Sequence, residues 1–256
     1  MLFRIARFLP YILVIYLVLP IISAFMLLSS VSLVDFFKLS NAMFISIASA
    51  FVTTIISALF GVPLAYMLAR GESRVNYVVE ALVISPIVLP PLATGLFLLS
   101  IFSPAGFIGN LANGSGFHIT RTFFAVVLAQ TAVASPFTVM SAKAAFEGVD
   151  VKLEFASRLM GAGRLKTFLM VSLPLAKKGI VAGLLMTFVR AVGEFGATFM
   201  LAYFPKTLPI YLYTSYLRGG IREAVPAAIV LWLIGVVVFI LMRATGDELA
   251  GTGRSG

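Results

Sequence analysis

Long apolar runs limit how this chain can fold more than any other feature of its sequence. No Asp, Glu, Lys or Arg occurs from Ala81 to Thr120. Only 11% of the 256 residues are charged, against roughly 25% in soluble domains. A soluble core could not cover this much apolar surface, so the sequence predicts that lipid is the solvent. We therefore predict an all-α integral membrane protein.

Six of the runs are long enough to cross a bilayer, which takes about 20 apolar residues. We predict one transmembrane domain over 1–256, with spans at 8–29, 41–69, 79–102, 122–142, 179–204 and 224–242. The second run is longer than a bilayer needs, so it is expected to tilt or to extend beyond the membrane. The third contains Pro86, Pro90 and Pro91, which must kink or break it.

The distribution of Lys and Arg predicts the orientation of these spans. An even number of spans puts both termini on one side. With the termini inside, the inner segments hold thirteen basic residues and Arg190 lies within a span. The outer segments then hold five, namely Lys38, Arg121, Lys206, Arg218 and Arg222. Because basic residues favour the cytoplasmic side, we predict a multi-pass protein of the cell membrane with both termini in the cytoplasm.

The first span has a second interpretation. Arg4 and Arg7 before an apolar run also resemble a signal peptide, although 8–29 exceeds the usual 7–15-residue core of such a signal. Cleavage would leave five spans.

Several classes of function are disfavoured by what the chain contains. Cysteine is absent and His118 is the only histidine, so neither a thiolate site nor a histidine metal site is expected. The net charge of +9 marks topology and needs no nucleic acid to explain it. A membrane enzyme is disfavoured because no H-E-x-x-H, acid cluster or Cys/His pair occurs.

One long polar segment, 148–174, lies on the cytoplasmic side in this topology. Leu153, Ala156, Leu159 and Met160 recur at helical spacing within it. Asp150 is expected to cap this helix, Gly161 and Gly163 to end it, and Pro174 to bar a continuous helix into the next span. Periodicity alone leaves two roles open, a helix that docks on a soluble partner and one that lies on the lipid surface.

This segment resembles the EAA loop of ABC importer permeases. The matching residues are Glu154, Ala156, Gly161, Val171, Leu173 and Pro174, while Phe155 and Ser157 depart from the pattern. The resemblance implies that Glu154 supplies the acidic contact of a helix that docks in a groove of the ATPase subunit. It also implies coupling roles for Phe155, Ala156, Arg158, Gly161, Ala162, Leu173 and Pro174. No G-x-x-x-x-G-K-[ST] motif occurs, so ATP and Mg²⁺ are expected on a separate ATPase chain and no cofactor on this one.

Arg190 and Glu194 are a charged pair inside the fifth predicted span. Their four-residue spacing puts them on one helix face, where they can pair. A charge at this depth costs about 2.5–3.5 kcal/mol, so a partner or a wet cavity is expected. Two interpretations stay open: a buried pair that fixes helix packing, and a polar face along the path of an anion.

Two further stretches resemble the permeases of molybdate, tungstate and sulfate importers. They are the proline-rich 85–95 and the Gly-Glu-Phe-Gly-Ala-Thr sequence at 193–198, while 202–213 resembles an outer loop of archaeal molybdate/tungstate permeases. The resemblance implies the type I importer fold with a coupling helix, a homodimer, two ATPase subunits and an extracellular binding protein. It places the pathway or gate at Thr94, Arg190, Glu194, Phe195, Gly196 and Thr198.

The resemblance implies an ATP-driven importer of an oxyanion, with molybdate or tungstate ahead of sulfate or thiosulfate. An ion-coupled carrier is the second hypothesis, because such carriers often have broken helices like the proline-rich third span. The single intramembrane acid and the lack of visible repeat symmetry argue against it. Uptake that needs an ion gradient and no ATP would favour it.

Overall fold

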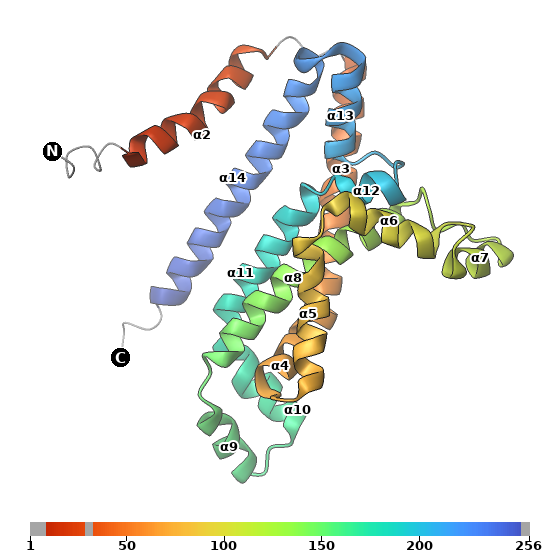
Figure 1. Ribbon diagram of the computed structural model, residues 1–256. Coiled ribbons are helices and arrows are strands. Elements are labelled where there is room, and N and C mark those ends of the chain that lie inside the picture. The colour runs from red at the N-terminus through yellow and green to blue at the C-terminus, as the bar shows by residue number, and fades with distance from the viewer. Residues whose placement is uncertain (1–8, 29–32, 252–256) are drawn as a thin grey trace.

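The computed structural model describes residues 9–28 and 33–251, and every regular element in this part of the chain is a helix (Figure 1). The helices are α2 (Leu9–Met26), α3 (Leu33–Ile56), α4 (Val62–Arg70), α5 (Arg74–Val88), α6 (Pro91–Phe102), α7 (Phe107–Gly114), α8 (Phe123–Glu147), α9 (Val151–Leu159), α10 (Arg164–Thr167), α11 (Leu173–Val192), α12 (Gly196–Leu201), α13 (Leu208–Gly219) and α14 (Ile221–Gly251). Two π-helical segments, η1 (Ser57–Gly61) and η2 (Phe168–Ser172), join α3 to α4 and α10 to α11.

The body of the molecule is built around α8, which contacts α3, α4, α5, α6, α11 and α12. Its closest neighbour, α11, is held by hydrogen bonds between the helices. Ser141 Oγ donates to the Gly179 carbonyl at 2.8 Å, Thr187 Oγ1 donates to the Ala134 carbonyl at 3.0 Å, and the hydroxyls of Thr138 and Thr187 are 2.6 Å apart. Lipid tails are as apolar as the side chains, so small residues and buried hydroxyl bonds of this kind hold membrane helices together.

The expectation that Pro174 bars a continuous helix is wrong. The chain is helical without a break from Arg164 to Val192, and η2 lies immediately before the proline. In a π turn the Leu173 amide bonds the Phe168 carbonyl, five residues back. This wider turn shifts the hydrogen-bond register, so the proline is accommodated without ending the helix. The segment η1 similarly precedes Pro63.

The third predicted span is broken, as its prolines predict. Helices α5 and α6 meet at an angle of 115°. Pro86 lies inside α5, whereas Pro90 and Pro91 occupy the break and the first turn of α6. The pair forms either a broken span or a re-entrant loop rather than a straight crossing.

The fifth predicted span, 179–204, is not one continuous helix. Helix α11 ends at Val192, and Gly193 to Phe195 separate it from the short helix α12. Helix α13 follows α12 and precedes α14, the helix of the last predicted span.

Within the described residues, four helices are long and apolar enough to cross a membrane, or five if the bent α5–α6 pair counts as one span. Tyr11–Met26 is a shorter apolar helix. It leans away from the bundle (Figure 1) and meets α14 through the edge-to-face pair of Phe25 and Trp232, whose ring centroids are 5.9 Å apart. Phe8 and Ser29, the ends of the first predicted span, lie outside the described residues, as do Arg4 and Arg7.

The contact between α6 and α12 leaves no room for a methyl group at Gly95. A Cβ there would lie 2.8 Å from the Cα of Ala197. We expect Gly95→Ala to lower the free energy of unfolding by about 1–3 kcal/mol, because backbone must move to admit it. Thermal denaturation of the purified protein in detergent measures the loss. The matched control is Gly235→Ala in α14, where a Cβ meets nothing within 4 Å. Equal melting temperatures for the two variants would show that this contact is not tight.

Candidate functional site

Helix α9 and the turn after it form one tip of the molecule, beyond the C-terminal end of α8 and the N-terminal end of the helical stretch that contains α11 (Figure 1). The Asp150 carboxylate accepts from the Lys152 amide at 2.9 Å, which confirms the predicted N-cap. At the other end, Gly161 has φ +89°, and the amides of Gly161 and Ala162 bond the carbonyls of Arg158 and Ser157. This is a Schellman motif, so the predicted stop at Gly161 is confirmed. Gly163 instead caps the start of α10.

The Glu154 carboxylate is turned into the protein, and the residue is only 2% exposed. Arg70 donates to its Oε1 twice, from Nε at 3.1 Å and from Nη2 at 2.8 Å. Ser172 Oγ donates to the same oxygen at 2.8 Å, and Tyr66 Oη donates to Oε2 at 3.0 Å. We call these four residues the Glu154 clamp. It joins α9 to α4 and to the end of η2.

The inward position of Glu154 corrects one part of the sequence-based expectation. The resemblance implies an acidic contact from Glu154 to the ATPase, but its carboxylate is buried and already holds three partners. Glu154 therefore fixes the helix to its own chain rather than presenting a charge at its surface. Arg158 also approaches it, with Nη2 4.0 Å from Oε2.

The environment of Glu154 sets the direction of its pKa shift. Burial by itself raises the pKa of this carboxyl, since it disfavours the charged form. The hydrogen bonds from Arg70, Ser172 and Tyr66 favour the charged form, and their sum outweighs the burial, so the pKa lies below its ordinary value. The clamp is thus built around an ionised carboxylate.

The opposite side of α9 is apolar and exposed. The exposed fraction is 49% for Leu153, 60% for Phe155 and 89% for both Leu159 and Met160. We call these four residues the apolar face of α9. A groove beside it is lined by Ala156, Gly161, Ala162, Lys166, Met170, Val171, Pro174 and Leu175, among others. Leu173 is half-buried and packs against the core below.

Arg190 and Glu194 form an ion pair, as their spacing predicts. Arg190 belongs to the last turn of α11, whereas Glu194 follows the end of that helix. The Glu194 residue is 1% exposed, and its Oε1 accepts from the Ala197 amide at 2.8 Å. One carboxylate therefore neutralises Arg190 and also satisfies a free amide at the start of α12. This double engagement favours the packing interpretation of the pair.

The other predicted gate residues lie where α12 packs against its neighbours. Thr94 and Thr198 are buried on α6 and α12, two helices in contact, and neither hydroxyl has a hydrogen-bond partner among the described residues. A Cβ on Gly196 would lie 2.9 Å from the Leu92 amide nitrogen. Phe195 stacks instead with Phe199, at a centroid distance of 5.2 Å. A gate role for these residues stays a prediction.

Sequence reasoning missed three members of the Glu154 clamp. No sequence pattern predicts contacts from Arg70, Tyr66 or Ser172 to Glu154. Arg70 and Glu154 are 84 residues apart, so no local pattern connects them. The one available signal was an acidic residue among the apolar positions of a short helix, which requires a partner once it is buried.

A model of the family described as "binding-protein-dependent transport system inner membrane component" matches residues 61–248. The probable molybdenum ABC transporter permease protein of Haloferax volcanii is 49% identical over 79% of this chain and 74% of its own. The molybdate/tungstate transport system permease protein WtpB of Pyrococcus furiosus is 38% identical over 82% of this chain and 78% of its own.

Two solved structures share the fold. The bacterial alginate ABC transporter, in complex with its alginate-bound periplasmic protein, superposes with a TM-score of 0.69 at 19% identity, over 96% of this chain and 94% of that one. The inward-facing MetNI methionine ABC transporter gives a TM-score of 0.63 at 20% identity, over 84% and 99%. At these identities the likeness shows the fold alone, and it confirms the predicted type I importer architecture.

The Glu154 clamp predicts a loss of stability in Glu154→Gln. The amide keeps the shape of the side chain but leaves the Arg70 guanidinium without a counter-charge. Because Arg70 stays partly exposed, we expect a loss of about 2–3 kcal/mol rather than the 3–5 kcal/mol of a fully buried pair. Chemical denaturation in detergent micelles measures it, with the exposed Glu72→Gln as the control.

The same variant predicts a pH dependence. The folded-state pKa of Glu154 is lowered, so its contribution is complete at pH 7 and is lost as the pH falls from the unfolded value of about 4.3 through the folded one. The stability difference between the natural protein and Glu154→Gln should therefore shrink on acidification. A difference that stays constant or grows below pH 4 would contradict the clamp.

Because Arg190 and Glu194 form an ion pair, substitutions at these two residues should have non-additive effects on stability. Arg190→Leu leaves a buried carboxylate uncompensated, and we expect a loss of about 3–5 kcal/mol. Adding Glu194→Gln removes that charge but keeps an oxygen to cap α12, so the double variant should be more stable than Arg190→Leu alone. A double-mutant cycle measures the coupling. If the folded double variant has lost transport, the pair has a role in the pathway beyond packing.

Proposed function

Because this chain belongs to the family of binding-protein-dependent transport system inner membrane components, we propose that it is the permease subunit of an ATP-driven importer for molybdate or tungstate. As a permease subunit it performs no bond chemistry. It converts the movement of an ATPase into a movement of its spans.

The Glu154 clamp together with the apolar face of α9 is the observation that carries this proposal. A helix that only lay on lipid would need no buried ion pair to fix its angle to the bundle. Here Arg70 and Ser172 hold α9 to the inner ends of two long helices, while Leu159 and Met160 project outward at 89% exposure. An exposed apolar patch on a fixed support is typical of a protein–protein contact.

The clamp also gives the direction of force transmission. A partner that holds the apolar face of α9 and then moves displaces Glu154 with it. Arg70 and Tyr66 pass the displacement to α4, and Ser172 passes it to α11. Both helices contact α8, so the spans would move together in the alternating-access cycle.

The partners of the proposed complex follow from family membership and from the resemblance. Two ATPase subunits would bind ATP and Mg²⁺ and dock on the apolar face of α9 in each copy of a homodimer. An extracellular binding protein would deliver the anion to the outer side. Both termini would lie in the cytoplasm, which agrees with the excess of basic residues on the side of α9.

The choice of anion rests on the relatives. The proteins of Haloferax volcanii and Pyrococcus furiosus carry molybdenum, or molybdate and tungstate, in their names. This supports molybdate or tungstate over sulfate or thiosulfate for this chain. The Haloferax volcanii relative is an ABC transporter permease by name, which supports ATP as the energy source over an ion gradient.

We expect proteoliposomes that contain this chain with its ATPase and its binding protein to accumulate tungstate only when ATP is supplied.

Leu159→Glu with Met160→Glu should abolish accumulation and co-purification of the ATPase, because charges replace the exposed apolar contacts. Leu111→Glu, at a similarly exposed position on α7, is the control. The docking role is excluded if the ATPase stays bound to the double variant. The importer assignment is excluded if the natural complex accumulates tungstate without ATP.

A further inference from the structure

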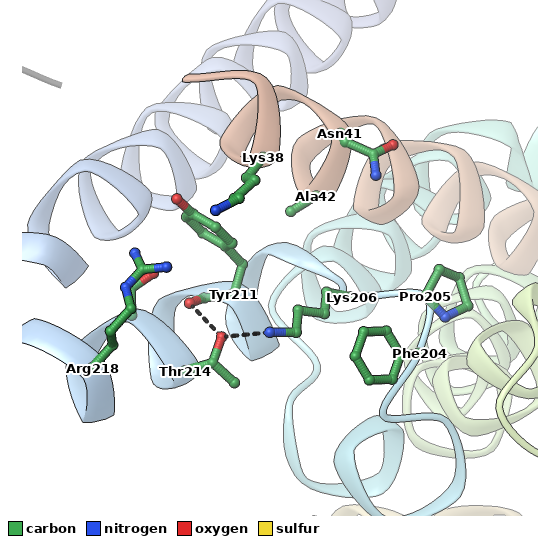
Figure 2. Close-up of a pocket in the computed structure, with 10 residues that line it drawn as sticks. Lys38, Asn41, Ala42, Phe204, Pro205, Lys206, Tyr211, Thr214 and Arg218 are labelled. Carbon is green, nitrogen blue, oxygen red and sulfur yellow. Dashed lines mark hydrogen bonds between the residues drawn. The ribbon is translucent and has the colours of Figure 1, made fainter. Parts of the chain in front are cut away.

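A cationic pocket lies between the start of α3, the 203–207 loop and α13 (Figure 2). These elements lie at the end of the molecule opposite α9 (Figure 1). Its volume is about 400 Å³, within the range of small-ligand sites. The polar side chains that line it include Lys38, Asn41, Lys206, Tyr211, Thr214 and Arg218. None of these residues belongs to the clamp or to the predicted gate.

Arg218 contributes little uncompensated charge to this pocket. Its Nε is 2.6 Å from Oε2 of Glu223, and its Nη2 is 3.5 Å from Oδ1 of Asp35. With two carboxylates in contact, the guanidinium is already neutralised. Its role is to tie α13 to α14 and to the start of α3.

Lys206 is held in place without a counter-charge. Its Nζ donates to Thr214 Oγ1 at 3.3 Å and lies 5.6 Å and 5.5 Å from the ring centroids of Tyr203 and Phe204. These contacts order a half-buried ammonium but do not neutralise it. Within the described ranges, no carboxylate lies at ion-pair distance from Lys206 or Lys38.

We propose that this pocket is an anion subsite in which Lys38 and Lys206 bind a doubly charged tetrahedral oxyanion. Two ammonium groups match the charge of such an ion, and each offers three donors to its oxygens. The Thr214 hydroxyl lies beside Lys206 and also lines the pocket (Figure 2). The lysine ammonium is a hydrated point charge, whereas the arginine guanidinium binds oxyanions with two parallel hydrogen bonds. Lysine therefore suits a site from which the ion must be released again. The identity of the anion, molybdate or tungstate, rests on the proposed function.

Equilibrium dialysis of tungstate against the purified complex of this chain with its ATPase, without the binding protein, tests the subsite directly. The natural complex should retain tungstate saturably. Lys38→Gln with Lys206→Gln should weaken that retention at least tenfold. Arg222→Gln removes one positive charge, as each of the two Lys→Gln changes does, at an exposed residue that does not line the pocket, and it should leave retention unchanged. Equal retention by the natural complex and the double variant overturns the proposal.

The single variant Lys38→Gln tests the subsite without the risk of disturbing the fold. Lys206 packs on two rings, so its replacement could disturb the loop, whereas Lys38 is exposed. We expect Lys38→Gln to keep the melting temperature and to weaken tungstate retention several-fold. Unchanged retention in this variant counts against the subsite.

A carboxylate of the binding protein is the competing occupant of the pocket. If the double variant retains tungstate normally but binds the anion-loaded binding protein more weakly, the pocket recognises a protein acid and the proposal is wrong. Failure of the proposed function is a separate result. In that case the natural complex does not transport tungstate with ATP, whatever the pocket binds.

Discussion

A buried carboxylate sets the position of the part of this molecule that projects furthest from the membrane domain. Taking a charge out of water costs several kcal/mol unless hydrogen bonds and a counter-charge replace its hydration. Glu154 is 2% exposed, and hydrogen bonds from Arg70, Tyr66 and Ser172 favour its ionised form against this burial. These partners come from two separate helices, and their geometry therefore fixes both the angle and the depth of α9. Removing any one of them would loosen the helix from the bundle.

Apolar contact alone could not hold the long helices of the bundle together. Side chains that leave lipid gain little by packing against other apolar side chains, so close backbone approach and hydroxyl bonds must supply the stability. The α8–α11 contact has both, in Gly179 and Gly183 against Ser141 and in the bond between Thr138 and Thr187. In the proposed cycle, a rigid α8–α11 pair would carry a displacement at η2 into the membrane interior.

The sequence predicts the parts of this structure that depend on local chemistry. Asp150 and Gly161 confirm their expected caps, and the prolines break the third span as expected. The predictions that failed concern the hydrogen-bond register of the helix at Pro174 and the side of α9 that faces the protein. Nothing in the residues around Pro174 indicates a π turn, because this turn depends on the packing of the whole helix. Amphipathic spacing likewise identifies the apolar side of α9 but not which side faces the protein. Here the buried side is the one that carries Glu154, because Arg70, 84 residues away, is there to receive it.

One helical stretch connects the two charged ends of the molecule. From Asp35 to Arg70 the chain is helical through η1, so Lys38 and Arg70 belong to the same long element. At 1.5 Å per residue they are about 48 Å apart along it. Lys38 lines the pocket at one end of this element, and Arg70 holds Glu154 at the other. On the side of the pocket, the Leu208 amide donates to Ser46 Oγ at 2.7 Å, which ties the start of α13 to this same element. A tilt imposed at Arg70 would thus change the spacing between Lys38 and the rest of the pocket, unless η1 bends enough to absorb it. In the proposed cycle, η1 lies between the Glu154 clamp and the pocket, so a stiffer π turn would couple the two more strongly.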